Sequence, residues 1–216
     1  MNNYAMAVMP LLALGSCLVS AAVPADPPMA GRDAFDSAPV GAPPPGWNSG
    51  VTGRGSPVWR VEADGSAPSL PNVLKQSGSG TFPWCVMTGV AVTDGWVEVK
   101  FKPIAGREDQ AGGLVWRWKD GNHYYVARAN ALENNVSLYY TESGRRMTIK
   151  YADAPVASNA WHTLRVEFSA ATIKVALDGK RYIDLTDSHV TGPGSVGMWT
   201  KADSVTAFDD FAYSGR

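Results

Sequence analysis

The sequence has little of what disulfide scaffolds, zinc sites and nucleic-acid surfaces require. It holds 2 cysteines in 216 residues, and only Cys85 lies beyond the apolar N-terminal stretch, so we expect no internal disulfide there. It has no Cys-x-x-Cys pair and no Cys/His cluster, which argues against a structural zinc ion. Lys and Arg number 19 and Asp and Glu number 20, which gives a net charge of -1. Because no positive field attracts phosphates, nucleic acid is not expected as a partner, nor is an anionic membrane surface.

Patterns typical of helices are also missing, because no helix-length stretch keeps an apolar stripe free of Gly and Pro. Apolar residues instead alternate with charged ones, as over 97–102, 164–168 and 173–177, which is the pattern of half-buried strands. The pair Asp178-Gly179 between two such runs predicts a tight β-hairpin. With 22 Gly and 15 Pro to form turns, the sequence predicts an all-β fold, a two-sheet antiparallel sandwich.

The N-terminus has the composition of an export signal, since residues 5–23 carry no charge and small residues and prolines follow them. We therefore predict a signal peptide over residues 1–25. The run Leu14-Gly15-Ser16-Cys17 offers an alternative, a lipoprotein signal that ends before Cys17 and leaves a lipid anchor on that residue. Residues 26–46 are rich in Pro, Ala and Gly and predict a tether, and residues 47–216 predict the folded domain. This domain is expected to be extracytoplasmic (periplasmic, cell-surface or secreted) and monomeric, with no membrane span in the mature chain.

Several segments carry a resemblance to a known superfamily. They read DQAGGLVWRWK at 109–119, YYVARANALENNV at 124–136, WHTLRVE at 161–167, LDG at 177–179, GMWTKAD at 197–203 and FDDF at 208–211. Over about residues 33–216 the chain resembles secreted bacterial domains of the concanavalin A-like lectin/glucanase superfamily. Within it, the chain looks most like the laminin-G-like and 3-keto-disaccharide hydrolase-like group, often labelled family 16 glycoside hydrolase. The resemblance implies a jelly roll whose concave sheet face binds sugars in many relatives, but a shared fold does not carry an activity with it.

The carboxylate pattern of a family 16 glucanase is absent. Those enzymes carry Glu-x-Asp-x-Glu on one strand, because a period of two puts the carboxylates on one face, about 6–7 Å apart. The acids nearest to such a pattern, none with an acidic neighbour two residues on, are Glu98, Glu133, Glu142 and Glu167. A glucanase mechanism is therefore disfavoured and the catalytic residues stay unknown, while a hydrolase of the 3-keto-disaccharide type remains open.

Strand alternation also predicts a saccharide site on the outer, concave face of one sheet. If Leu114, Trp116 and Trp118 point inward, Arg117 points outward, and the same reasoning applies to the neighbouring strands. The candidate sugar-binding residues are Arg117, Arg128, Asn130, Tyr139, Trp199 and Lys201. Guanidinium groups donate forked hydrogen bonds to sugar hydroxyls, and the C–H face of a pyranose packs on aromatic rings. The alternative is that these arginines pair with Glu98, Asp109 or Glu133 on a solvated face, and a one-residue slip would reverse the faces.

These observations predict a carbohydrate-recognition domain that binds a saccharide or glycan on its concave face. The alternatives are a glycoside hydrolase of the 3-keto-disaccharide hydrolase-like type and a structural or adhesion module. No cofactor is expected to be required. A structural calcium ion, as in some superfamily members, is a weaker hypothesis with Asp36 and Asp209 as its candidate ligands.

Overall fold

Alternating apolar and polar residues form strands throughout the part of the chain that the computed structural model describes, which is Met1 and residues 29–216. The predicted signal peptide, with Cys17 and its lipoprotein alternative, lies outside the described residues. No helix occurs within residues 29–216, and every strand pairing is antiparallel, so the predicted all-β antiparallel sandwich is confirmed. Among the described residues there is accordingly no helix of sufficient length and apolarity to span a membrane.

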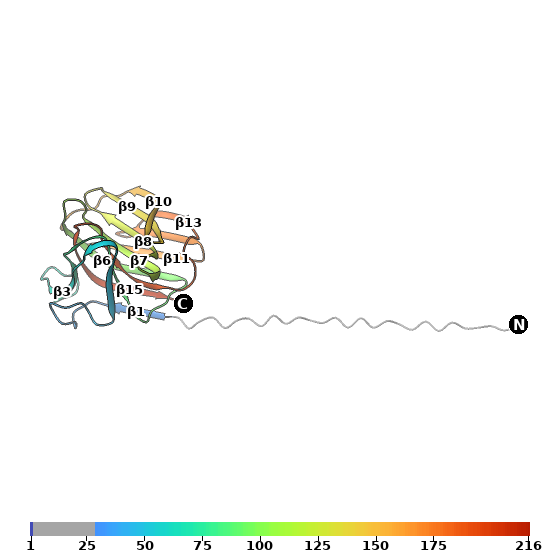
Figure 1. The fold of residues 1–216 in the computed structure, drawn as a ribbon, viewed down its shortest axis with the longest axis horizontal. Coiled ribbons are helices and arrows are strands. Elements are labelled where there is room, and N and C mark those ends of the chain that lie inside the picture. The colour runs from blue at the N-terminus through green and yellow to red at the C-terminus, as the bar shows by residue number, and fades with distance from the viewer. Residues whose placement is uncertain (2–28) are drawn as a thin grey trace.

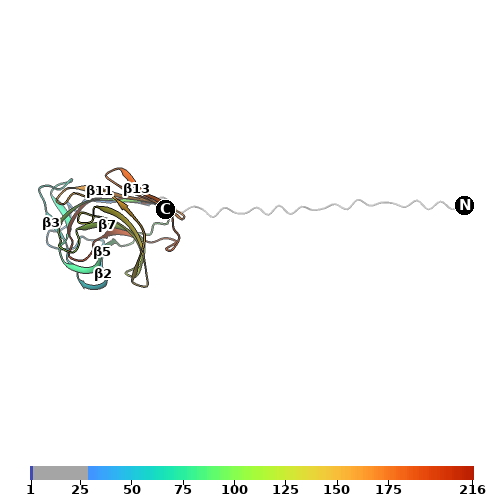
Figure 2. The same ribbon diagram turned by 90° about the horizontal axis from the view of Figure 1, so that it is seen from above.

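Two stacked sheets make up the sandwich, with β3, β11 and β13 in one layer and β2, β5 and β7 in the other (Figure 2). The eight-stranded sheet contains β1 (Met29–Asp33), β3 (Trp59–Ala63), β4 (Asn72–Gln76), β6 (Gly95–Ala105), β11 (His162–Ser169), β12 (Thr172–Leu177), β13 (Lys180–Thr186) and β15 (Val205–Gly215). Its order is β13-β12-β11-β6-β15-β4-β3, and β1 also pairs with β15. The seven-stranded sheet contains β2 (Trp47–Ser56), β5 (Ser79–Met87), β7 (Ala111–Asp120), β8 (His123–Asn130), β9 (Asn135–Glu142), β10 (Arg145–Asp153) and β14 (Ser195–Trp199). Its order is β10-β9-β8-β7-β14-β5-β2.

The main core lies between the two sheets and follows the period-two patterns of the sequence. On β6, Val97, Val99 and Phe101 are fully buried, and Leu114 and Trp116 of β7 face them from the other sheet. Large aromatic side chains contribute much of this core, and the Trp116 ring stacks between Tyr125 and Phe168. Burying such side chains is worth about 1.5–3 kcal/mol each, so this layer supplies most of the hydrophobic stabilisation.

Residues 29–46, which precede β2, also contribute to this core. Strand β1 pairs with β15 over Met29–Asp33, close to the C-terminus (Figure 1). The ring of Phe35 is fully buried and lies 5.7 Å from that of Trp47, and the Asp33 carboxylate accepts a 2.8 Å hydrogen bond from the Trp47 indole. The expected tether over residues 26–46 therefore contains a paired strand and a buried core residue.

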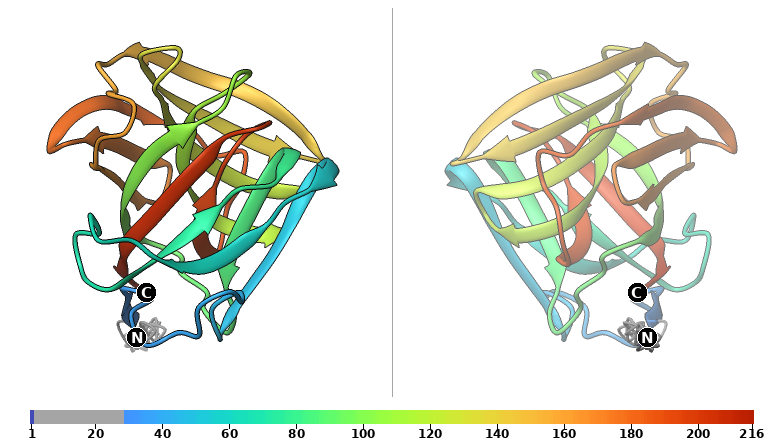
Figure 3. Two further views of the ribbon diagram at one scale, coloured as in Figure 1. Left: turned by 90° about the vertical axis from the view of Figure 1, so that its left-hand side faces the viewer. Right: turned by 90° about the vertical axis from the view of Figure 1, so that its right-hand side faces the viewer.

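The seven-stranded sheet is strongly rolled, so that its outer face is concave and its edge strands β10 and β2 turn toward the same side (Figure 3). Four strands separate β10 from β5 in the sheet order, which in a flat sheet would place them roughly 24 Å apart. The guanidinium of Arg146 on β10 nevertheless lies 4.6 Å from the ring centre of Phe82 on β5. Likewise, the Thr52 hydroxyl of β2 lies 2.8 Å from the Tyr124 hydroxyl of β8. Side chains from distant strands thus meet across the concave face.

A substitution at Gly112 tests how closely the main core is packed. A Cβ atom there would lie 2.3 Å from Cδ2 of the buried Phe101 ring, so Gly112→Ala forces that ring to move. We expect the free energy of unfolding, measured by urea denaturation, to fall by about 1–3 kcal/mol. Gly65→Ala is the control, because a Cβ there meets nothing within 4 Å. Equal stability of the two variants would contradict this packing.

Candidate functional site on the concave face

The concave face carries a second apolar cluster, separate from the main core. Its buried members are Trp84, Val86, Ala111, Val115, Tyr124, Val126, Tyr139 and Trp199, with Phe82 and Trp118 partly buried beside them. The outer face of a two-sheet sandwich usually meets solvent, and here it is closed because the rolled sheet brings its own side chains together above it. The ring of Phe82 stacks over Trp199 at 5.7 Å, and the Arg146 guanidinium lies 4.1 Å from the ring of Tyr139.

Strand register places the predicted polar residues on this face. Arg128 on β8 pairs with Gly113 of β7 and with Ser137 of β9. One pair further along the same face, Val126 lies opposite Tyr139. The residues between them, such as Ala127 and Leu138, point into the main core as the alternation predicts. The structure brings five of the six candidates to this face, namely Arg128, Asn130, Tyr139, Trp199 and Lys201.

A buried carboxylate, Asp109, organises the charged groups at one end of the face. It is fully buried and accepts hydrogen bonds from Arg128 at 3.3 Å, from the Asn130 amide and from the Lys201 ammonium. Sequence reasoning named Asp109 only as an alternative partner for the arginines. These contacts join the β6–β7 loop to β8 and to the end of β14. Breaking one of them would leave an uncompensated charge in a buried site, so they hold the loop in place.

Arg128 links this network to the solvent. Its guanidinium donates a 2.6 Å hydrogen bond to Glu133, whose side chain is half-exposed, and a 3.1 Å hydrogen bond to the Tyr139 hydroxyl. Burial alone would raise the pKa of Glu133, but hydrogen bonds from Asn135 and Arg128 outweigh it and lower that pKa below its usual value. Glu133 is therefore ionised at neutral pH and serves as a counter-charge.

A hollow of about 410 Å3 opens beside this network, at the end of the concave face. Its side-chain lining includes Arg54, Thr81, Phe82, Glu108 and Lys201. The volume falls in the range of small-molecule sites, and the lining combines one aromatic ring with charged and hydroxyl groups. We call it the mouth pocket. Lys201 belongs both to the pocket and to the buried Asp109 network, so the buried charges hold one wall of the pocket in place.

The structure adds residues that sequence reasoning missed. Phe82, Arg54 and Arg146 come from β5, β2 and β10, and these strands enclose the face from its two sides. The burial pattern of β10 shows no clean alternation, and a register shift between Thr148 and Lys150 interrupts its pairing with β9. Alternation alone therefore does not identify Arg146 as a residue of the concave face. Their approach depends on the rolling of the sheet, and no local pattern encodes it.

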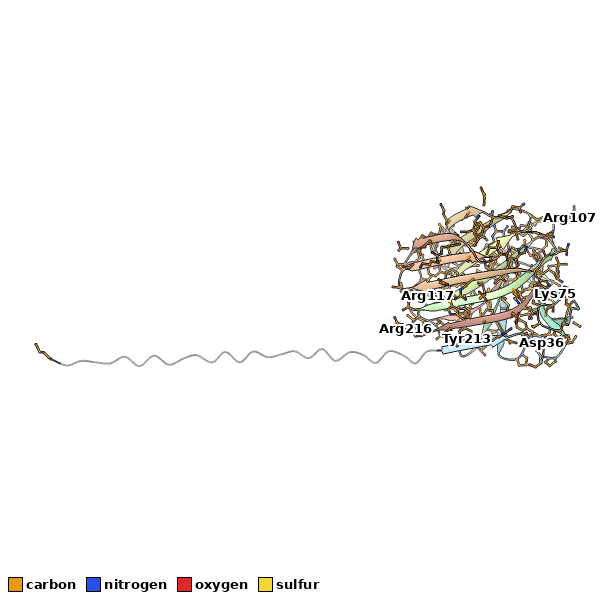
Figure 4. All side chains as sticks on the ribbon, turned by 180° about the vertical axis from the view of Figure 1, so that it is seen from behind. Asp36, Lys75, Arg107, Arg117, Tyr213 and Arg216 are labelled. Carbon is orange, nitrogen blue, oxygen red and sulfur yellow. The ribbon has the colours of Figure 1, made fainter. Side chains whose placement is uncertain are left out.

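Arg117 lies elsewhere, and the predicted faces of Arg117 and Trp118 are wrong. A bulge at the end of β7, where Arg117 has a φ of 47°, shifts the alternation against both neighbouring strands. Trp118 therefore joins Trp84 in the concave-face cluster, and their ring centres lie 5.1 Å apart. Arg117 is 2% exposed and donates to the backbone carbonyls of Thr93, Ala170 and Val190. Figure 4 shows it at the opposite end of the sandwich from Arg107, which lies in the same β6–β7 loop as Asp109.

Arg117 thus ties three loops together, and its substitution should reduce stability. Arg117→Met leaves buried carbonyl groups without donors, and we expect it to lower the free energy of unfolding by about 3 kcal/mol in urea denaturation. Arg165→Met is the control, because Arg165 pairs with Glu98 and Glu167 on a partly exposed face, where ion pairs contribute about 0–1 kcal/mol. An equal effect of both substitutions would contradict the structural role of Arg117.

Hollows also occur near the outer face of the eight-stranded sheet, and one of about 480 Å3 is lined by Glu167, Lys174 and Arg216 among others. Another of about 400 Å3 is lined by Glu98, Arg165 and Glu167 among others. These three side chains already pair with one another, at 3.3 Å and 3.1 Å. None of these three side chains has a buried polar atom that lacks a hydrogen-bond partner. We therefore take the concave face as the candidate site.

The two calcium candidates, Asp36 and Asp209, each accept hydrogen bonds from neighbouring residues. The Asp209 carboxylate accepts hydrogen bonds from the backbone and hydroxyl of Ser69 and from the backbone of Asp210. Asp36 accepts one from the backbone of Asn72. Over residues 29–216, no group of three or more His, Cys, Asp or Glu side chains is arranged to hold a metal ion. These carboxylates fit a structural hydrogen-bonding role better than calcium ligation.

Metal removal tests this assignment. Because the Asp209 and Asp36 oxygens already accept hydrogen bonds, we expect the unfolding temperature to be the same in EDTA and in millimolar calcium. Differential scanning calorimetry of the protein in both buffers measures it. A rise of several degrees in calcium would instead restore the calcium hypothesis, and Asp209→Asn should then abolish the rise.

The two-layer antiparallel arrangement with a rolled sheet is that of a concanavalin A-like jelly roll, so the predicted jelly-roll fold is confirmed. No protein-family profile and no curated protein sequence matches the chain. Among solved structures, the carbohydrate binding module CBM66 from Bacillus subtilis is similar, with a TM-score of 0.64 and 21% identity over 77% of this chain and 93% of that one.

Two further structures share the fold. The Bacillus licheniformis beta-glucanase has a TM-score of 0.58 and 15% identity, over 87% of this chain and 98% of that one. The exoplasmic/lumenal domain of VIP36, in its Ca2+/Man3GlcNAc-bound form, has a TM-score of 0.54 and 13% identity, over 78% of this chain and 83% of that one. Identities this low show a common fold, and the function must be argued from the site.

Proposed function

We propose that this protein is a carbohydrate-recognition domain that binds a saccharide at the mouth pocket of its concave face. The observation that supports this most is the lining of the pocket, where the Phe82 ring lies beside Arg54, Glu108, Thr81 and Lys201. An aromatic ring packs against the C–H face of a pyranose, while guanidinium, ammonium, carboxylate and hydroxyl groups bond its hydroxyls. A carbohydrate binding module and a mannoside-bound domain among the fold neighbours agree with this proposal.

The site residues act differently from those expected at first. Trp199 and Tyr139 are fully buried beneath Phe82 and Arg146, so in this arrangement they support the binding surface from below. Arg128 and Asn130 are also buried and hold Asp109. Direct contact with a sugar falls to the groups that line the mouth pocket, of which Lys201 alone was predicted.

We further propose that recognition occurs without catalysis. Glycoside hydrolysis requires one carboxylic acid with a raised pKa to protonate the leaving group. Glu133 has a lowered pKa instead, and Asp109 is held by two cationic groups and an amide. Glu133 is therefore not suited to the acid role, and Asp109 is fully buried beneath the face. An extracytoplasmic location, in keeping with the predicted export signal, would expose such a domain to polysaccharides.

The first test incubates the purified protein with a broad panel of neutral and acidic oligosaccharides, including 3-keto-glycosides. Retention of sugars on immobilised protein, with no release of products by chromatography, is the expected result. Released sugar would favour the glycoside hydrolase alternative. Absence of both retention and release would overturn the proposal and leave the adhesion alternative.

Substitutions in the mouth pocket locate the site. Arg54→Gln and Lys201→Gln remove charged hydrogen-bond donors from the pocket wall, so we expect each to weaken saccharide binding about 10-fold or more by isothermal titration calorimetry. Lys180→Gln serves as the matched control, because Lys180 is exposed on β13 of the other sheet. Unchanged affinity in both pocket variants would place the site elsewhere.

A further inference from the structure

One arginine on the concave face has aromatic neighbours but no counter-charge. The Arg146 guanidinium lies 4.1 Å from the ring centre of Tyr139, 4.6 Å from that of Phe82 and 5.7 Å from that of Trp199. In the described part of the chain it forms no ion pair, whereas Arg128 on the same face forms two, with Asp109 and Glu133. Its Nη1 atom is buried and has no hydrogen-bond partner.

The charges on this part of the face therefore do not balance. With the mouth pocket included, Arg54, Arg128, Arg146 and Lys201 supply four positive charges. Glu108, Asp109 and Glu133 supply three negative ones. Burial and the nearby Arg128 both lower the pKa of Arg146, but a guanidinium stays protonated in proteins. The face consequently carries an uncompensated cation in a partly desolvated place, where a bound anion would gain most.

The other unsatisfied atoms on the face point to the same kind of ligand. Besides Arg146, the buried side-chain atoms without a partner here are the indole nitrogens of Trp84, Trp118 and Trp199 and the hydroxyl of Thr141. Thr141 pairs directly with Arg146 across β9 and β10. The guanidinium of Arg146 only donates hydrogen bonds, so a group that satisfies its Nη1 atom must present acceptor oxygens. A carboxylate consists of acceptors alone, whereas a sugar hydroxyl is both donor and acceptor.

We propose that the saccharide bound by this protein is acidic, and that a sugar carboxylate pairs with the Arg146 guanidinium, which lies over the Phe82 ring. This inference rests on the proposed saccharide function and specifies the ligand class as a uronate-bearing oligosaccharide. The forked donors of arginine match the two oxygens of a carboxylate. Tyr151, half-exposed on the same strand and packed against Tyr139, provides a ring on which the sugar of that carboxylate rests. The ligand then runs from β10 toward the mouth pocket at Lys201.

Matched pairs of ligands test the proposal. Oligogalacturonate, oligomannuronate and oligoglucuronate are titrated by calorimetry into the purified protein, each beside its carboxyl-reduced, neutral counterpart. We expect at least one acidic member to bind 10-fold or more tightly than its neutral counterpart, with an advantage that falls as sodium chloride is raised. Equal affinity for the acidic and reduced members would overturn the acidic ligand and leave the proposed saccharide function standing. Absence of binding by every acidic and neutral oligosaccharide would overturn both.

A pair of neighbouring arginines supplies the variants. Arg146→Gln should remove the preference for the acidic ligand, while Arg145→Gln should retain it, because Arg145 is exposed and adjacent in the chain. A preference that survives in Arg146→Gln would overturn the assignment of the carboxylate to Arg146. If Arg146→Gln does not fold, the acidic ligand is still tested on the unaltered protein, by whether its advantage over the neutral ligand falls as sodium chloride is raised.

Discussion

The curvature of the seven-stranded sheet is the constraint on which the rest of this structure depends. Side chains from strands that would be far apart in a flat sheet meet across its outer face, Arg146 against Phe82 and Thr52 against Tyr124. Rolling the sheet in this way buries a second apolar cluster, which an open sandwich would leave in water. The mouth pocket lies at the end of this face, so the geometry that stabilises the domain also shapes the proposed binding site.

At the mouth-pocket end of the concave face, residues that stabilise the domain also line the proposed binding site. Asp109 is buried with Arg128, Asn130 and Lys201 around it, and Asp203 holds the preceding loop by accepting hydrogen bonds from its backbone amides. Removing one charge from such a network is costly because the remaining charge stays buried. Lys201 lies at the surface of this network and forms part of the wall of the mouth pocket. Arg146 forms no ion pair within the described residues and its buried Nη1 atom has no hydrogen-bond partner, and the proposed acidic ligand rests on this.

Much of the fold followed from period-two patterns that are visible in the sequence. Val97, Val99 and Phe101 lie in the main core as their alternation predicts, and Arg128 and Tyr139 lie on the opposite face of their strands from Ala127 and Leu138. The alternation failed at Arg117, where a bulge reverses the faces, and the sequence around it contains no proline or glycine that marks such a bulge. Resemblance to a superfamily identified the architecture, and the solved structures confirm it at the level of the fold.

The sequence by itself determined which side chains share a face within each strand, because that depends only on the local geometry of an extended chain. It also showed that the acidic triplet of a glucanase is absent. Only the tertiary structure decided which strands face one another across the roll, and hence that Trp199 is covered and that Arg146, Phe82 and Arg54 surround the site. Sheet curvature arises from the summed twist, bulges and packing of many strands, so no single segment of sequence encodes it.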